Sequence, residues 1–259
     1  MNTENNNNNN NKVSVITVVF NAIEKIEETI LSVINQDYNS IEYIVIDGGS
    51  SDGTVDIIKK YSKQISLLIS EEDLGIYHAM NKGLDKSTGQ WVNFMNAGDT
   101  FTDKSVIRNV FENVIDADID VVYGNSIVRK QNDSLHCFKA NKPISELWKG
   151  PVFRHGAMFT RTDVHKMYPF NLNIKYKVCA DFDFIYKINV LGHQMKYVDV
   201  DVIIFEEDGI SNNGFKNLKY NRMILLSYKH TFKQNIISLM RSNVFRVYFI
   251  LQKVKSLIK

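Results

Sequence analysis

The sequence predicts an α/β fold in which helices flank a mostly parallel, mixed sheet. Runs rich in β-branched residues, such as Val13–Phe20 and Ile41–Ile46, lack polar alternation, which is typical of strands buried on both faces. Segments with apolar residues at helical spacing separate these runs along the chain. This β-α-β-α order favours a doubly wound parallel sheet.

The expected elements alternate regularly as far as Met95. The segment after the first strand carries apolar residues every three or four positions, Asp52 or Thr54 is suited to cap the second helix, and Gly89 breaks the chain before the fourth strand. The expected strands are Val13–Phe20, Ile41–Ile46, Ile65–Ser70 and Trp91–Met95, and the expected helices are Glu24–Asn35, Val55–Tyr61 and Gly75–Leu84.

Beyond Asp99 the expected elements are less regular. They are the helix Ser105–Ile115, the strands Val121–Tyr123 and Ser126–Arg129, the short helices Lys142–Gly150 and Arg161–Met167 around the strand Ala157–Thr160, the helix Ala180–Leu191 and the strand Lys196–Ile204. From Phe215 onward the chain is expected to form two basic C-terminal helices.

Composition indicates a soluble globular protein, with 44% hydrophobic and 23% charged residues among 259. Cys137 and Cys179 show no metal-ligand spacing and are expected to be structural cysteines in a reducing cytoplasm. The polar start of the chain lacks the apolar core of a signal peptide, and no run approaches the roughly 18 apolar residues of a membrane span.

Two strands of the predicted sheet end in acidic, glycine-containing turns. Asp47 and Gly48 follow one strand, and Asn96 to Asp99 follow another. The carboxyl ends of parallel strands meet at one edge of the sheet, where α/β proteins bind their ligands. The sequence therefore predicts a site for a nucleotide and a metal ion at this edge.

Several of these segments resemble the family 2 glycosyltransferases, which have the GT-A fold. The resemblance rests on SVITVVFNA, IDGGSSDGT, LGIYHAMNKGL with STGQWV, NAGD and CADFDF, in this order. RHGAMF and EEDGISNNG echo the bacterial enzymes that build O-antigen, capsule and exopolysaccharide units. The resemblance spans roughly residues 13–211 and implies a Rossmann-like GT-A catalytic domain there.

The resemblance implies inverting transfer of a sugar from a nucleotide-sugar, with uridine as the expected base, to an acceptor hydroxyl. A divalent cation, Mn²⁺ or Mg²⁺, would neutralise the departing diphosphate, and a carboxylate would take the acceptor's proton. Asp99 is the expected metal ligand, with Asn96 beside it. The family usually has two or three acids at this position, whereas this turn has one. The alternative is that Asp99 only stabilises its turn.

The same resemblance assigns Asp47, Gly48, Phe20, Asn21 and Lys82 to donor binding. The two residues that end the first strand would lie beneath the nucleobase, and Asp47 would face the base or ribose. Each has a simpler interpretation: a turn-forming Asp, a core Phe and a solvated helix Lys.

Asp181 is the expected general base, because it matches the family's catalytic acid. We expect burial against neighbouring aromatic residues to raise its pKa. Helix capping by Asp181, with Asp183 in the first turn, is the structural alternative. Asp183 is a second candidate for the base or an acceptor contact, and His155 is expected to contact the acceptor or the diphosphate.

Residues 1–12 are expected to be a disordered, Asn-rich lead and residues 212–259 a basic amphipathic helical tail. Residues 209–259 hold ten of the 31 Lys and Arg residues and none of the 29 Asp and Glu residues. This polarity favours peripheral binding to the anionic inner face of the cell membrane, where a polyprenyl-diphosphate-linked saccharide would be the acceptor. Packing on the domain or in a homodimer is the alternative.

Two other functions fit the sequence less well. A sugar nucleotidyltransferase needs a Gly-rich basic loop after the first strand, which NAIEKIEE lacks. A degenerate nucleotide-sugar-binding protein without transferase activity would explain the thinned acid cluster. No nucleic-acid partner is expected, since the basic tail carries no recognition motif and the remainder is acidic.

Overall fold

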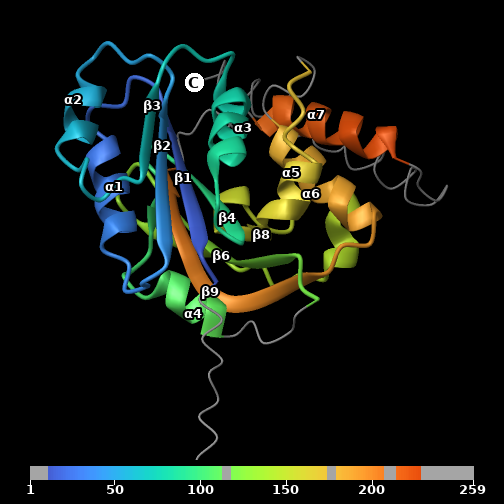
Figure 1. Ribbon diagram of the computed structural model, residues 1–259. Coiled ribbons are helices and arrows are strands. Elements are labelled where there is room, and N and C mark those ends of the chain that lie inside the picture. The colour runs from blue at the N-terminus through green and yellow to red at the C-terminus, as the bar shows by residue number, and fades with distance from the viewer. Residues whose placement is uncertain (1–10, 113–117, 174–178, 207–213, 229–259) are drawn as a thin grey trace, which may run out of the picture.

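The computed structural model describes residues 11–112, 118–173, 179–206 and 214–228. They form a nine-stranded mixed sheet with helices on both faces (Figure 1). The hydrogen-bonded strand order is β3-β2-β1-β4-β8-β6-β9-β5, and β7 pairs with β6. The predicted α/β class with a mostly parallel, mixed sheet is confirmed.

The first four strands are parallel and end at a common edge. They are β1 (Val13–Val19), β2 (Ile41–Asp47), β3 (Leu67–Ser70) and β4 (Trp91–Asn96), connected by the helices α1 (Ile26–Ile34), α2 (Thr54–Lys59) and α3 (Ile76–Lys86). Asp47 lies between Val19 and Ser70, while Asn96 pairs with Val18. The last residues of four strands are therefore side by side.

The second half of the sheet mixes directions. It contains β5 (Thr100–Phe101), β6 (Val121–Arg129), β7 (Leu135–Phe138), β8 (Met158–Arg161) and β9 (Met195–Glu206). β8 is antiparallel to both β4 and β6, whereas β9 is parallel to β6. The carboxyl ends of β6 and β9 thus point toward the same edge as those of β1 to β4.

The predicted elements differ from the observed ones in this half. β6 is one continuous strand where the sequence predicted two, and the short strands β5 and β7 were not predicted. The remaining helical elements are α4 (Val106–Glu112), η1 (Ile144–Lys149), η2 (His155–Ala157), α5 (Thr162–Met167), α6 (Ala180–Val190) and α7 (Gly214–Ser227). The second expected tail helix and most of the Asn-rich lead lie outside the described residues.

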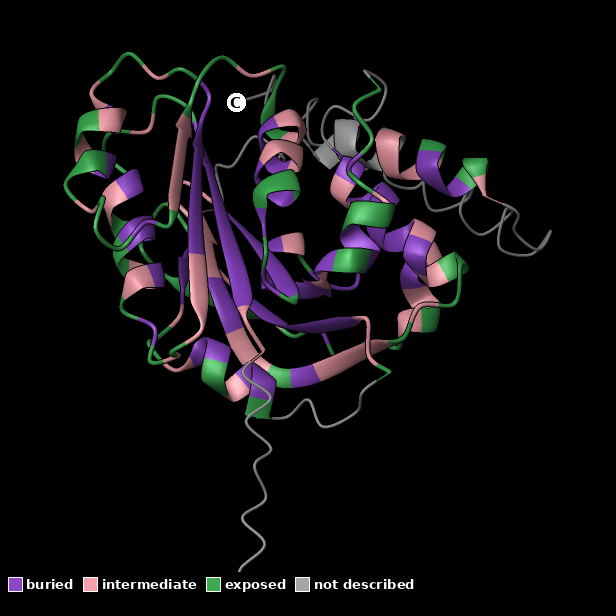
Figure 2. Cartoon of the chain, viewed as in Figure 1, coloured by how far each residue is buried: buried purple, intermediate pink, exposed green. Residues whose placement is uncertain are grey.

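Successive residues of β1 point to opposite faces of the sheet and build two apolar cores. Ile16 and Val18 pack with α3, α6 and α7, while Val15 and Val19 pack with α1, α2 and α4. Figure 2 shows that the strands at the centre of the sheet are buried along most of their length. A Cβ at Gly83 of α3 would lie 2.4 Å from Ile16 Cγ2, so glycine lets this helix approach the sheet closely.

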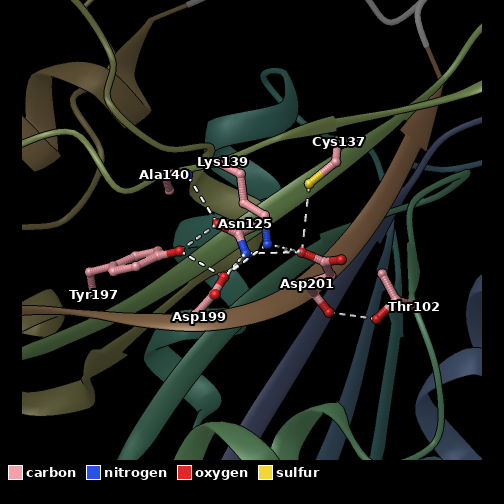
Figure 3. A network of polar contacts seen from close by, with 8 residues as sticks. All are labelled: Thr102, Asn125, Cys137, Lys139, Ala140, Tyr197, Asp199 and Asp201. Carbon is pink, nitrogen blue, oxygen red and sulfur yellow. Dashed lines mark hydrogen bonds and ion pairs between the residues drawn. The ribbon is translucent and has the colours of Figure 1, made fainter.

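A polar network holds β6, β7 and β9 together at an irregularity in the sheet (Figure 3). The fully buried Asn125 donates from Nδ2 to Asp199 Oδ1 and Asp201 Oδ1, both at 2.9 Å. Its Oδ1 accepts from the backbone N–H of Ala140 at 3.0 Å. Lys139 Nζ lies 2.9 Å from Asp199 Oδ1 and 3.5 Å from Asp201 Oδ1 and offsets part of the negative charge of the two acids. The network replaces ladder hydrogen bonds that the bulge disrupts.

In the part of the chain that the structure describes, no helix has both the length and the apolar character needed to cross a bilayer.

Candidate active site

Helix α1 holds the turn after β4 through hydrogen bonds of Thr29. The Thr29 hydroxyl accepts from the Gly98 N–H and donates to the Asp99 carbonyl oxygen, each at 2.9 Å. Gly98 has a φ of 97°, which glycine adopts without strain. Burial raises the pKa of Asp99 to about 6, against the opposing effects of His155 and of hydrogen bonds from Asn96.

His155 connects this turn to the expected base. Its Nδ1 lies 3.2 Å from Asp181 Oδ2, and its Nε2 lies 3.5 Å from Asn96 Nδ2. The Tyr77 hydroxyl donates to Asp181 Oδ1 at 2.9 Å. Residues from β4, η2, α6 and α3, far apart in the sequence, therefore meet at one place.

A buried amide fixes the loop that carries His155. Asn93, in the middle of β4, donates from Nδ2 to the carbonyl oxygens of Gly156 and Met158, both at 2.9 Å. A Cβ at Gly156 would come within 2.9 Å of Ile203 Cδ1. The loop therefore lies close against β9, and the hydrogen bonds from Asn93 hold the segment that carries His155.

The pKa of Asp181 is lowered, contrary to the expectation. Burial alone would raise this pKa, as predicted from the neighbouring aromatic residues, but hydrogen bonds and charge from His155 and a hydrogen bond from Tyr77 outweigh burial. Burial lowers the pKa of His155, but the hydrogen bond and negative charge of Asp181 raise it by more, so its net shift is upward. Each of the two groups therefore favours the charged form of the other.

Asp181 does not cap α6. The N-cap residue is Cys179, and the carboxylate of Asp181 is turned toward His155 and Tyr77. Asp183 is buried on another face of the helix, where its Oδ1 accepts at 3.2 Å from the hydroxyl of Tyr228, the residue that follows α7. The structure thus brings Asp181, and not Asp183, to His155.

The carboxylate of Asp47 stabilises its own turn. It is fully buried and accepts from the backbone N–H groups of Gly49 and Ser50 and from the Ser70 hydroxyl, at 3.2, 3.1 and 2.7 Å. These contacts agree with the turn-forming interpretation. They also order the loop that follows β2, next to the exposed Phe20.

Phe20 is not a core residue, since 64% of it is exposed. A Cβ at Gly48 would lie 3.5 Å from Phe20 Cδ2 and 3.3 Å from Asp73 Oδ2. Asn21 has a φ of 46° and links two loops, because its Oδ1 accepts from the Ser51 N–H at 2.9 Å. Phe20, Gly48 and Asp73 thus form an aromatic and acidic corner at the ends of β1 and β2.

Lys82 is engaged by acids of the loop after β3. Its Nζ lies 2.7 Å from Asp73 Oδ1 and 2.8 Å from Glu71 Oε1. Sequence reasoning missed Asp73, whose Oδ2 is buried without a hydrogen-bond partner in the described structure. The sequence could have indicated Asp73 as a site residue, because it closely follows a third parallel strand that ends at the same edge.

Two oxygen donors of the β4 turn suit a hard divalent cation. One is the carboxylate of Asp99, and the other is Asn96 Oδ1, which is buried and has no hydrogen-bond partner among the described residues. Within those residues, no group of three or more His, Cys, Asp and Glu side chains is placed to hold a metal ion. The protein would supply few ligands, and a bound diphosphate would supply others.

The chain has a GT-A-like fold. TarS 1–349 of S. aureus in complex with UDP-GlcNAc superposes with a TM-score of 0.68 at 16% identity, over 89% of this chain and 71% of that one. The mannosyltransferase PcManGT of Pyrobaculum calidifontis, in complex with GDP-Man and Mn²⁺, superposes with a TM-score of 0.66 at 17% identity, over 89% and 69%. The superposition with another TarS 1–349 structure covers 64% of that structure's chain, so the protein spans about two thirds of the length of that fragment.

The chain belongs to glycosyl transferase family 2, whose model matches residues 14–171. A PGL/p-HBAD biosynthesis glycosyltransferase of Mycobacterium bovis is 26% identical over 221 residues, which are 83% of this chain and 84% of that protein. The putative teichuronic acid biosynthesis glycosyltransferase TuaG of Bacillus subtilis is 40% identical over 90 residues, 34% of this chain and 36% of its own length. The predicted glycosyltransferase class is confirmed.

Proposed function

We propose that this glycosyltransferase moves a sugar from a nucleotide-sugar, UDP-linked in the first instance, to a hydroxyl of a lipid-linked saccharide, with inversion at the anomeric carbon. One observation carries the proposal: His155 joins Asp181, the only acid of α6 turned toward it in the described structure, to the Asn96–Asp99 turn. A carboxylate base and a diphosphate site would then share one reaction centre.

The donor half of the site would be formed by the ends of β1 to β4. The exposed ring of Phe20 offers a face on which a nucleobase can stack, and the unpaired Asp73 Oδ2 offers an acceptor to a base N–H or a ribose hydroxyl. Gly48 lies between them, where a Cβ would come within 3.3 Å of Asp73 Oδ2. The turn formed by Asp47 holds this corner in shape.

Asp99 and Asn96 would hold a divalent cation with the donor diphosphate. The cation would supply neutralising charge for the leaving nucleoside diphosphate. UDP-GlcNAc in a TarS complex and Mn²⁺ with GDP-Man in PcManGT support this choice of ligand chemistry by analogy of fold.

Asp181 would accept the proton of the acceptor hydroxyl while that oxygen attacks the anomeric carbon. The new C–O bond forms as the bond from carbon to phosphate oxygen breaks, and the electron pair leaves with the diphosphate. Tyr77 and His155 hold the Asp181 carboxylate in place. Because the pKa of Asp181 is lowered, its carboxylate is ionised at neutral pH and can accept the proton.

A lipid-linked acceptor and a site at the inner face of the cell membrane are proposed from two observations. The named relatives act in PGL/p-HBAD and, as a putative assignment, teichuronic acid biosynthesis. The acid-free segment 209–259 carries ten basic residues. Domain limits of 13–211 for catalysis and 212–259 for the basic tail remain predictions, as does a homodimer.

A donor screen tests the proposed function. The full chain is incubated with UDP- and GDP-sugars, Mg²⁺ or Mn²⁺ and extracted lipid-linked saccharide, and nucleoside diphosphate release is measured with and without the acceptor. Acceptor-dependent release with an inverted product is the expected result. Nucleotide-sugar binding without transfer to any acceptor would instead favour the degenerate binding protein, which the small set of acids at Asn96–Asp99 motivates.

A further inference from the structure

Arg154 lies immediately before His155 and has no role in the site so far. Its guanidinium carbon lies 5.0 Å from the ring centroid of Phe205, the penultimate residue of β9. Its backbone carbonyl oxygen accepts from the Ala157 N–H at 3.1 Å, in the loop that Asn93 anchors to β4. The backbone of Arg154 is thus held in this loop, and its guanidinium lies over an aromatic ring.

Two acids of the candidate active site act on this guanidinium from different elements. Burial lowers the pKa of Arg154, while the negative charges of Asp181 and Asp99 raise it. An arginine keeps its proton under such opposing influences, because its pKa in water is above about 12. A permanent positive charge therefore lies within electrostatic reach of both the expected base and the expected diphosphate site.

The donors of Arg154 are uncommitted. In the described parts of the chain, no ion pair and no hydrogen bond engages its guanidinium. The two lysines near the donor half differ in this respect: Lys25 pairs with Glu206, and Lys82 pairs with Glu71 and Asp73. Of these three cations, Arg154 alone presents its N–H groups without an acidic partner.

We propose that Arg154 binds the diphosphate of the nucleotide-sugar and neutralises the charge that develops on it during transfer. This inference rests on the proposed function. A guanidinium has five N–H donors in a planar fork that matches phosphate oxygens, and stacking on Phe205 orients the fork without consuming its donors.

Arg154 contributes charge and hydrogen bonds but transfers no proton. The bond between the anomeric carbon and the phosphate oxygen breaks, its electron pair moves to that oxygen, and Arg154 stabilises the added negative charge. The acceptor proton goes to Asp181. Such preorganised charge acts on the transition state more than on the ground state, because the leaving oxygen gains charge as the bond breaks.

The test compares Arg154→Met, which keeps an apolar stem against Phe205, with Arg154→Lys and a matched control. Arg161→Met is the control, because Arg161 also stacks on an aromatic ring, with its guanidinium carbon 5.9 Å from the Trp91 ring centroid, and pairs with the exposed acid Asp163. Titration calorimetry with UDP, GDP and UMP measures binding, and thermal melting checks that each variant folds.

We expect Arg154→Met to weaken binding of the nucleoside diphosphate about tenfold to a hundredfold, from the usual energy of a hydrogen bond to a charged group. UMP binding should change less, and turnover should fall further than affinity. Arg154→Lys should restore part of the loss, and Arg161→Met should match the wild type.

Two outcomes would overturn the inference while the proposed function stands. In one, the wild type and Arg154→Met bind the nucleoside diphosphate equally and turn over donor equally. In the other, diphosphate affinity is unchanged but the KM for a phosphorylated acceptor rises, which assigns Arg154 to the acceptor's phosphate. Failure of the wild type itself to bind or use any nucleotide-sugar would instead reject the proposed function.

Discussion

The proposed base can be separated from its neighbour by an isosteric substitution. Asp181→Asn should retain nucleotide-sugar binding and lose about a hundredfold to ten-thousandfold in transfer, because the amide cannot accept the acceptor's proton. Calorimetry and product release measure the two effects. Asp183→Asn is the comparison, since Asp183 binds Tyr228 and not His155. Full turnover by Asp181→Asn would remove this residue from the base assignment.

We expect Asp99 to make metal-dependent nucleotide binding sensitive to mild acid. Its pKa is raised to about 6, so lowering the pH through 6 would protonate the carboxylate and remove the proposed metal ligand. Binding of UDP with Mn²⁺ should therefore weaken toward tenfold per pH unit below about 6, from simple competition with one proton. Asp99→Ala should abolish this dependence on pH and metal, and identical titrations for both proteins would contradict the role.

A buried histidine outside the active site should set the acid stability of the fold. His165 is fully buried and stacks on Phe184 with centroids 3.9 Å apart, and burial lowers its pKa to about 3. Above about pH 6.5 both folded and unfolded His165 are neutral. Below that pH the unfolded chain binds a proton that the folded protein excludes, so stability falls as pH falls, by up to about 1.4 kcal/mol per pH unit.

Urea unfolding at pH 7.5 and pH 5 measures this effect. The His165→Phe variant removes the titrating group and should lose less stability between the two pH values than the wild type. Comparing the two proteins cancels the contribution of His155, whose pKa is raised and whose effect has the opposite sign. An equal loss in both proteins would show that His165 titrates normally.

At the scale of elements, most of the strands and helices of the first half could be predicted, because apolar runs mark its buried strands and apolar residues at helical spacing mark its helices. The buried strands β1, β2 and β4 begin where predicted, at Val13, Ile41 and Trp91. Gly124 and Asn125 misled the prediction for β6, since glycine and asparagine usually interrupt strands. The strand continues because Asn125 finds partners on β9 and in the segment after β7, and sequence patterns do not reveal such distant partners.

Asn125 should therefore matter more for stability than a typical surface amide. Asn125→Ala leaves buried polar groups without partners and should cost about 1–3 kcal/mol. Lys139→Met should cost less, because Lys139 is half exposed and an ion pair near solvent contributes little. Urea unfolding measures both. Equal stability of Asn125→Ala and the wild type would show that the network is dispensable.

Across the whole molecule, the edge of the sheet that carries the site was predictable, but the contacts inside the site were not. Because parallel strands end at one edge of a sheet, Asp47 and Asp99 were predicted to lie at the same edge, and the structure places them there. The pairing of His155 with Asp181 and the capture of Lys82 by Asp73 depend on loops whose paths have no periodic signal. The lowered pKa of Asp181 could not be predicted for the same reason, since it depends on those contacts.

In the sequence, strand β8, where the strand direction reverses, separates the residues proposed to bind the donor from the proposed base. Every residue assigned to the donor, Arg154 included, precedes β8 in the chain, while Asp181 comes after it, on a helix beyond the 14–171 segment that matches the family. The two portions are not independent, because Phe205 of β9 lies against Arg154. A lineage of such enzymes could vary the portion beyond β8, and with it the glycans that it assembles, only while an aromatic ring is kept at this position.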